Sequence, residues 1–201
     1  MSNIKTVIFD IGRVMMGFEW MPFVNGLWGT EKAARITDAI WKEGRWNELD
    51  RGEPEDKVLQ SFIDADPELE KEIRETFARV GESMTRKDYA IPWIKEVKEL
   101  GYQVLFLSNY SYYLRALKPE VLDFVPVMDG GIFSCNVHLT KPEREIYQKI
   151  CEMYSLIPEE CLFIDDNKDN IKAAEEFGMN TVLFKDFETS YPQVMSLLIE
   201  E

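Results

Sequence analysis

The sequence TVIFD at residues 6–10 joins a short apolar run to a single aspartate. A short apolar run that ends in a turn signal is typical of a strand buried on both faces. Two later stretches repeat the arrangement, VLFLSN at residues 104–109 and LFIDD at residues 162–166. Ligand sites of open parallel sheets lie at the carboxyl ends of the strands. The three stretches therefore predict a parallel sheet with reactive side chains along one edge.

The rest of the chain supports an α/β fold with an insertion. Helical and strand patterns alternate from about residue 88, which is typical of a doubly wound, Rossmann-type sheet. We expect strands at 4–10, 103–108, 131–134, 161–165 and 180–184, and helices at 89–100, 111–117, 142–154, 168–177 and 189–200. Pro142 should be the first residue of its helix.

Residues 17–87 show helical periodicity and no convincing strand. Helix starts are expected at Thr30, as an N-cap, and near Pro54 and Pro67. This stretch therefore predicts a small α-helical cap domain at 17–87, inserted into a core domain formed by 1–16 and 88–201.

Composition narrows the classes of function. The chain has 201 residues, 45% of them hydrophobic, and a formal net charge of −14. The acidic surplus disfavours nucleic acid and anionic membranes as partners. No apolar run is long enough to cross a bilayer, and no signal peptide precedes the first strand. We therefore expect a cytoplasmic protein. Separately, we expect a monomer or a weak homodimer.

Cysteine and histidine usage excludes several kinds of site. The three cysteines, Cys135, Cys151 and Cys161, include no CxxC motif, which argues against a disulfide framework and a structural zinc site. Cys161 should begin a buried strand. The sequence has one histidine, His138, so a multi-histidine metal centre is impossible. We expect His138 to lie in a loop.

Each polar group after a predicted strand has a chemical and a structural interpretation. Asp10 is a nucleophile or metal ligand, or it accepts turn hydrogen bonds. Ser108 and Asn109 bind an anion, or they cap the next helix. Lys141 neutralises a phosphate, or it is a solvated lysine.

The pair Asp165–Asp166 is the strongest single signal. Adjacent carboxylates at the end of a buried strand repel each other unless a cation lies nearby. Oxygen ligands select a hard cation such as Mg²⁺. The alternative is that the pair caps the helix expected at residue 168.

Taken in order, these motifs resemble those of the haloacid dehalogenase superfamily. The resemblance rests on IFDIG at 8–12, LSN at 107–109, TKP at 140–142 and FIDD at 163–166, with FGM at 177–179. Within the superfamily the chain is similar to bacterial sugar phosphatases of the α-D-glucose-1-phosphate phosphatase type. Those proteins often have asparagine after the DxG motif, where this chain has Arg13.

The resemblance implies a Mg²⁺-dependent phosphatase that acts on a small phosphorylated molecule. Asp10 would attack phosphorus and form an aspartyl-phosphate. Mg²⁺ would be held by Asp10, the carbonyl oxygen of Gly12, Asp166, and Asp165 directly or through water.

The resemblance also implies roles for the two middle motifs. Ser108 and Lys141 would hold the transferring phosphoryl oxygens, and Asn109 would orient the same loop. Charge neutralisation and positioning are what phosphoryl transfer chiefly requires.

One position departs from the pattern of most superfamily phosphatases. They carry a second aspartate, a general acid and base, where this chain has Gly12. Such help is typically worth ~10²–10⁴ in rate, so we expect Gly12→Asp to raise alkyl phosphate hydrolysis if proton transfer limits it. Glu19 and Glu48 are candidate substitutes, and Trp20 or Trp46 is a candidate for packing against a sugar ring.

Two other functions stay open at this point. A metal-independent carbon–halogen hydrolase would use the same nucleophile, but it has little use for the acidic pair at 165–166. A weakly active or non-catalytic regulator that binds a phosphorylated ligand is compatible with Gly12 and Arg13. A receiver domain is excluded because its acidic pair comes before the acceptor aspartate.

Overall fold

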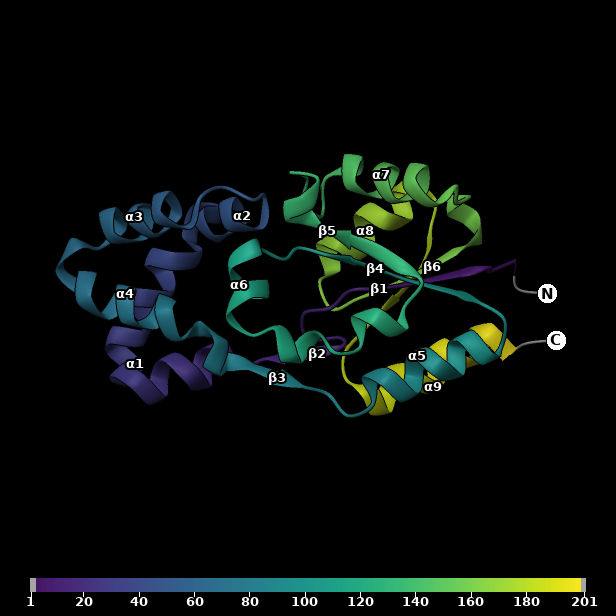
Figure 1. Cartoon of the computed structure of the whole chain (residues 1–201), viewed down its shortest axis with the longest axis horizontal. Helices are drawn as coiled ribbons and strands as arrows, with labels where there is room; N and C mark the ends of the chain where they lie inside the picture. Colours follow the sequence, from purple (N-terminus) through teal and green to yellow (C-terminus); the bar gives the residue numbers. More distant parts are fainter. Residues whose placement is uncertain (1–2, 200–201) are drawn as a thin grey trace.

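The computed structural model describes residues 3–199 and shows a five-stranded parallel sheet. Its strands are ordered β5-β4-β1-β6-β7 (Figure 1). They comprise β1 (Thr6–Phe9), β4 (Gln103–Ser108), β5 (Gly130–Phe133), β6 (Cys161–Asp165) and β7 (Asn180–Leu183). From β1 the chain builds the sheet first toward β5 and then toward β7. The strand order reverses at β1, which is where open α/β sheets place their ligand sites.

Helices cover both faces of the sheet, as expected for a doubly wound fold (Figure 1). Ile8, Leu105 and Phe163 pack in one core with α7 (Arg144–Tyr154) and α8 (Lys168–Phe177). The intervening residues, such as Phe9 and Phe106, pack in the other core with α5 (Ala90–Glu99) and α9 (Phe187–Ile199). Because alternate strand residues point to opposite faces, continuous apolar runs bury both faces. The predicted fold class is confirmed.

The predicted core elements are present with small shifts at their ends, and residue 200, where the last helix was expected to end, lies outside the described residues. Cys161 begins β6 as expected, and His138 is an exposed loop residue. The prediction that Pro142 opens a helix is wrong, since α7 begins at Arg144. A turn intervenes, in which the Glu143 amide donates to the carbonyl of Thr140 and the Thr140 hydroxyl donates to the Glu143 carboxylate.

Four helices form the inserted unit at one end of the core (Figure 1). They are α1 (Trp20–Trp41), α2 (Arg45–Asp50), α3 (Glu55–Ala65) and α4 (Glu70–Arg79). Pro67 begins a 3₁₀ turn that leads into α4. α1 is two helical stretches divided at its one non-helical residue, Gly29 (φ 72°), so a stretch begins at Thr30 as predicted, but the residue in the N-cap position is Gly29 and not Thr30. Glycine adopts this left-handed backbone at low cost, so the break precedes Thr30.

Two short strands connect the cap to the core, where the sequence suggested no strand. β2 (Met16–Phe18) pairs antiparallel with β3 (Met84–Arg86). Each has three residues, too few for an alternating pattern to show, and the partners lie far apart in the chain. The remaining elements are α6 (Tyr112–Leu117) and 3₁₀ turns at 42–44, 67–69, 80–83, 119–122, 125–127, 134–136 and 158–160.

Among residues 3–199, none of the helices combines the length and apolarity that a membrane crossing needs. Cys135, Cys151 and Cys161 are buried free thiols.

Candidate active site

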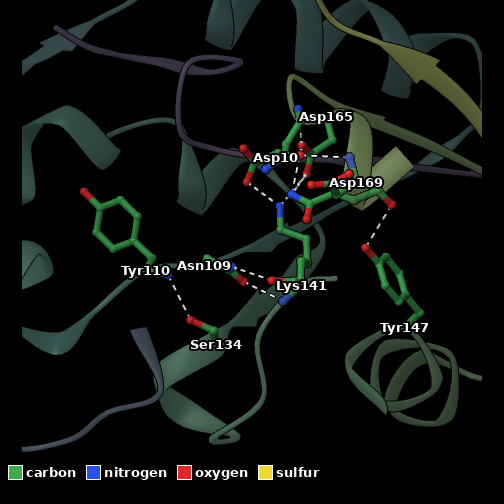
Figure 2. Close-up of polar contacts among 10 residues, drawn as sticks. Asp10, Asn109, Tyr110, Ser134, Lys141, Tyr147, Asp165 and Asp169 are labelled. Carbon is green, nitrogen blue, oxygen red and sulfur yellow. Dashed lines mark hydrogen bonds and ion pairs between the residues drawn. The ribbon is translucent and has the colours of Figure 1, made fainter. Parts of the chain in front are cut away.

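Two carboxylates and one lysine meet at the carboxyl ends of β1 and β6. The Lys141 ammonium donates to Asp10 Oδ1 at 2.7 Å and to Asp165 Oδ2 at 2.6 Å (Figure 2). All three residues are at least nine-tenths buried. Burial alone would lower the pKa of Lys141, but the two carboxylates outweigh it and raise that pKa. Lys141 is therefore a fixed positive charge beside Asp10.

Asp165 is held from three directions. Its Oδ1 accepts the Asn167 amide at 2.8 Å, and the Asn170 side chain donates to both of its oxygens at 3.0 and 3.1 Å. Since its Oδ2 also accepts a hydrogen bond from Lys141, Asp165 positions the lysine ammonium. The cap of α8 is Asn167, whose side chain accepts the Asp169 amide, so the acidic pair is not the helix cap.

Three carboxylates are close enough to share one cation. Asp10, Asp165 and Asp166 each offer an oxygen, and these atoms lie within 4.8 Å of one another. Burial raises the pKa of Asp10 to about 7, with Lys141 opposing and the two other aspartates adding to it. Burial and Asp165 also raise the pKa of Asp166. These carboxylates are short of positive charge, and an all-oxygen set suits Mg²⁺, so the residues fit this ion.

Arg13 supplies a second, weaker positive charge. Its guanidinium lies 3.7 Å from Asp166 Oδ2 and is largely exposed. Its backbone has φ 60°, a left-handed conformation that asparagine adopts more readily than most residues.

The loop after β4 fixes the backbone of Lys141. The Asn109 side chain donates to the carbonyl oxygen of Lys141 at 2.9 Å and accepts its amide at 2.8 Å (Figure 2). Helix α6 is capped by Ser111, whose hydroxyl accepts the Leu114 amide. The capping interpretation of Ser108 is therefore wrong, and this buried residue faces the candidate site instead.

A cavity of about 490 Å³ lies between the core and the cap. Its core side is formed by Asp10, Gly12, Ser108, Asn109, Lys141 and Asp166. The core residues predicted for the site all line it except Asp165, which lies behind Lys141. The structure thus brings the four distant motifs together around one opening.

The cap side of the cavity is mainly aromatic. Trp20 and Trp46, both predicted candidates, line it together with Trp41. Trp41 and Trp46 are stacked at 4.6 Å between ring centroids, and Trp20 meets Trp41 edge-on at 5.5 Å. These rings form a rigid apolar wall opposite the acidic cluster.

The two glutamates proposed from the sequence do not line this cavity. Glu19 and Glu48 are both exposed and lie outside its lining. The carboxyl group that the cap does place there is Asp50, the last residue of α2, which is 5% exposed. Sequence reasoning missed Asp50 because it lies in a polar stretch without a strand or helix-cap pattern.

A family comparison agrees with this arrangement. The model of haloacid dehalogenase-like hydrolases matches residues 4–178, which include both the core motifs and the cap. The chain belongs to this family. As a member it is a hydrolase, and the predicted resemblance to the superfamily is confirmed.

Curated relatives of this family member include two phosphatases. A sesquiterpene phosphatase of Aspergillus oryzae is 26% identical over 186 residues, which cover 89% of this chain and 88% of the relative. An enolase-phosphatase of Aquifex aeolicus is 29% identical over 192 residues, covering 90% and 82%.

Solved structures of the family share the fold. A predicted HAD-like family hydrolase of Porphyromonas gingivalis matches with a TM-score of 0.77 and 22% identity, covering 99% of this chain and 100% of that one. A HAD family enzyme of Bacteroides thetaiotaomicron, solved with magnesium and inorganic phosphate, matches with a TM-score of 0.70 and 21% identity, covering 90% and 94%.

The turn after α2 docks the cap onto the core. The Arg51 guanidinium pairs with the Glu143 carboxylate, and His138 Nδ1 contacts the carbonyl of Arg51 at 2.7 Å. Gly52, at φ 88°, passes so close to the core that a Cβ there would lie 2.9 Å from the carbonyl of Cys135. This turn therefore tolerates only glycine at residue 52 without moving the cap.

We expect Gly52→Ala to lower kcat/KM for a turned-over phosphate ester by about tenfold or more, because displacing this turn by an ångström moves cap residues away from the site. Steady-state kinetics measure this. Gly29→Ala is the matched control, since Gly29 has a similar φ of 72° but no atom within 4 Å of its Cβ position. Equal activity losses in the two variants would contradict the docking role.

Proposed function

We propose that the protein is a Mg²⁺-dependent phosphatase that hydrolyses a small phosphate monoester through a phosphorylated Asp10. The observation that carries the proposal is the buried contact of Lys141 with both Asp10 and Asp165, beside the carboxylate of Asp166. Such a cluster places a nucleophile next to a fixed cation and a site for a divalent one. Two phosphatases among the curated relatives support it.

The residues of the site divide the reaction between them. A carboxylate oxygen of Asp10 forms a bond to phosphorus while the bond from phosphorus to the ester oxygen breaks. Lys141 and Ser108 hold the phosphoryl oxygens. Water then attacks the aspartyl-phosphate, releasing inorganic phosphate and restoring the Asp10 carboxylate.

Mg²⁺ fits beside the nucleophile, with Asp10, Asp166 and the carbonyl of Gly12 as its proposed ligands and Asp165 acting through water. When bound, the ion supplies positive charge that offsets the charge of the nucleophile and of the phosphoryl group. The structure of a family member with magnesium and inorganic phosphate supports this choice of ion.

For the leaving group we propose a sugar. The aromatic wall of Trp20, Trp41 and Trp46 offers apolar faces on which the C–H face of a sugar ring packs, and Asn47 and Thr37 add polar groups to the lining. A cavity of about 490 Å³ is of the size that small-molecule sites have.

A phosphatase screen tests this function. The purified protein is assayed with sugar phosphates, nucleotides and small phosphate esters, with and without Mg²⁺, and with Asp10→Asn as the blank. We expect Mg²⁺-dependent phosphate release that is highest with sugar phosphates. Halide release from haloacids without Mg²⁺ would instead indicate the dehalogenase, and binding of phosphate esters without turnover would indicate the non-catalytic regulator.

A further inference from the structure

A carboxyl group of the cap faces the catalytic cluster and has no assigned task. Asp50 lines the same cavity as Asp10 and Lys141, yet it comes from the opposite wall. Its Oδ1 is completely buried and has no hydrogen-bond partner. A buried polar atom without a partner is costly, so its retention points to a group that it meets only when a ligand is bound.

The backbone of Asp50 is held firmly while its side chain is not. The Ser134 hydroxyl donates to the carbonyl oxygen of Asp50 at 2.5 Å, and the same hydroxyl oxygen accepts the Tyr110 amide. Ser134 and Tyr110 belong to the core domain, and Figure 2 shows the hydrogen bond between them. The core thus fixes the position of this cap residue and leaves its carboxyl group toward the cavity.

The surroundings keep this carboxyl group protonated at neutral pH. Burial raises the pKa of Asp50 to about 8, with Asp10 adding to the rise and Lys141 opposing it. Tyr110 and Cys135 are the other titratable groups that interact with Asp50, and burial raises both of their pKa values, so both are neutral there. A neutral carboxylic acid is able to donate a proton at physiological pH.

The core domain offers no residue at position 12 that could donate a proton to the leaving group. Gly12 has no side chain, and a Cβ added there would meet only Asp10 Oδ2, at 3.9 Å. The space beside the nucleophile is therefore not filled by another proton donor from this position. The leaving group must extend away from Asp10 toward the cap, because the nucleophile attacks in line with the bond that breaks.

We propose that Asp50 is the general acid and base of the reaction, delivered by the cap in place of a core residue. It donates its proton to the ester oxygen as the bond from phosphorus to that oxygen breaks. The Asp50 carboxylate that results then takes a proton from the water that attacks the aspartyl-phosphate, which restores the acid. This inference rests on the proposed phosphatase function.

Single-turnover kinetics of Asp50→Asn test the inference, with phosphorylation of Asp10 measured for two substrates. An alkyl phosphate has a basic leaving group that needs a proton, whereas 4-nitrophenyl phosphate has a weakly basic one that does not. We expect phosphorylation by the alkyl phosphate to fall by ~10²–10⁴-fold, and phosphorylation by 4-nitrophenyl phosphate to stay within about tenfold of the wild type. Equal falls for both substrates, or no fall for either, would overturn the assignment.

Two further variants separate chemistry from packing. Glu48→Gln, on the exposed side of the same helix, should leave both rates unchanged. The double variant Gly12→Asp/Asp50→Asn should be phosphorylated by the alkyl phosphate at least tenfold faster than Asp50→Asn alone, because Gly12→Asp supplies an acid from the core. A double variant as slow as Asp50→Asn, in a folded protein, counts against the inference.

The pH profile gives an independent readout. Phosphorylation of the wild type by the alkyl phosphate should decline above pH 8, where Asp50 loses its proton, and Asp50→Asn should lack that decline. The same decline in both proteins would contradict the role of Asp50. If the wild type forms no aspartyl-phosphate from either substrate, the proposed function itself fails, which is a different result from a change confined to Asp50 variants.

Discussion

Asp10→Asn should abolish phosphate ester hydrolysis, with kcat/KM reduced by at least about 10⁴-fold, because an amide is a poor nucleophile and cannot form the aspartyl-phosphate. The variant should fold normally. Burial raises the pKa of Asp10 to about 7, so the carboxylate is costly to keep in the folded state and its neutral isostere is not. Steady-state kinetics and thermal melting measure the two effects.

The control for this variant is Asp56→Asn, an exposed residue on α3 of the cap. It should keep wild-type activity, which would show that removing a carboxyl group outside the site does not itself lower the rate of hydrolysis. A residual rate for Asp10→Asn within about 100-fold of the wild type would show that another group attacks phosphorus.

Lys141→Met should be the most destabilising single change in the site. It leaves Asp10 and Asp165 buried without their shared cation, and breaking a buried ion pair by removing one partner costs about 3–5 kcal/mol. Phosphorylation of Asp10 should also fall by about 10³-fold, since a fixed positive charge at the phosphoryl group is lost. Denaturant unfolding and single-turnover kinetics measure these changes.

The destabilisation should depend on pH and on Mg²⁺. Without Lys141 the folded-state pKa of Asp10 rises further above its value in the unfolded chain, so stability is retained at acidic pH and lost as pH rises toward the folded-state value. Mg²⁺ should raise the melting temperature of Lys141→Met more than that of the wild type. Lys172→Met, on the exposed side of α8, is the control. An unchanged unfolding free energy at pH 8 would contradict the account.

The core domain and the site residues that it contributes were predictable because each is indicated by a short stretch of sequence. Apolar runs such as 104–107 identify buried strands without any knowledge of their neighbours, and parallel order then places Asp10 and Asp165 at the same edge. The sequence predicted Lys141 only as a positive charge near the nucleophile, and its contact with both carboxylates is a finding of the structure.

The site residue that the cap contributes and the strands that join the cap to the core were less predictable, because they depend on packing between segments far apart in the chain. Asp50 and Glu48 lie two residues apart in one polar stretch, and only the docking of α2 decides that one is buried and the other exposed. β2 and β3 are defined by pairing with each other, with three residues each. The helix start at Thr30 was predictable, but the left-handed backbone of Gly29, which occupies the cap position, was not.

The central claim is that Asp10 attacks phosphorus, and trapping its covalent adduct tests this most directly. The wild-type protein is mixed with Mg²⁺ and an efficiently hydrolysed phosphate ester, quenched in acid within one turnover, and its peptides are examined by mass spectrometry. The account predicts one added phosphoryl group on the peptide that contains Asp10, absent without Mg²⁺ and absent from Asp10→Asn. Phosphate release with no adduct on that peptide, or an adduct on another residue, would contradict it.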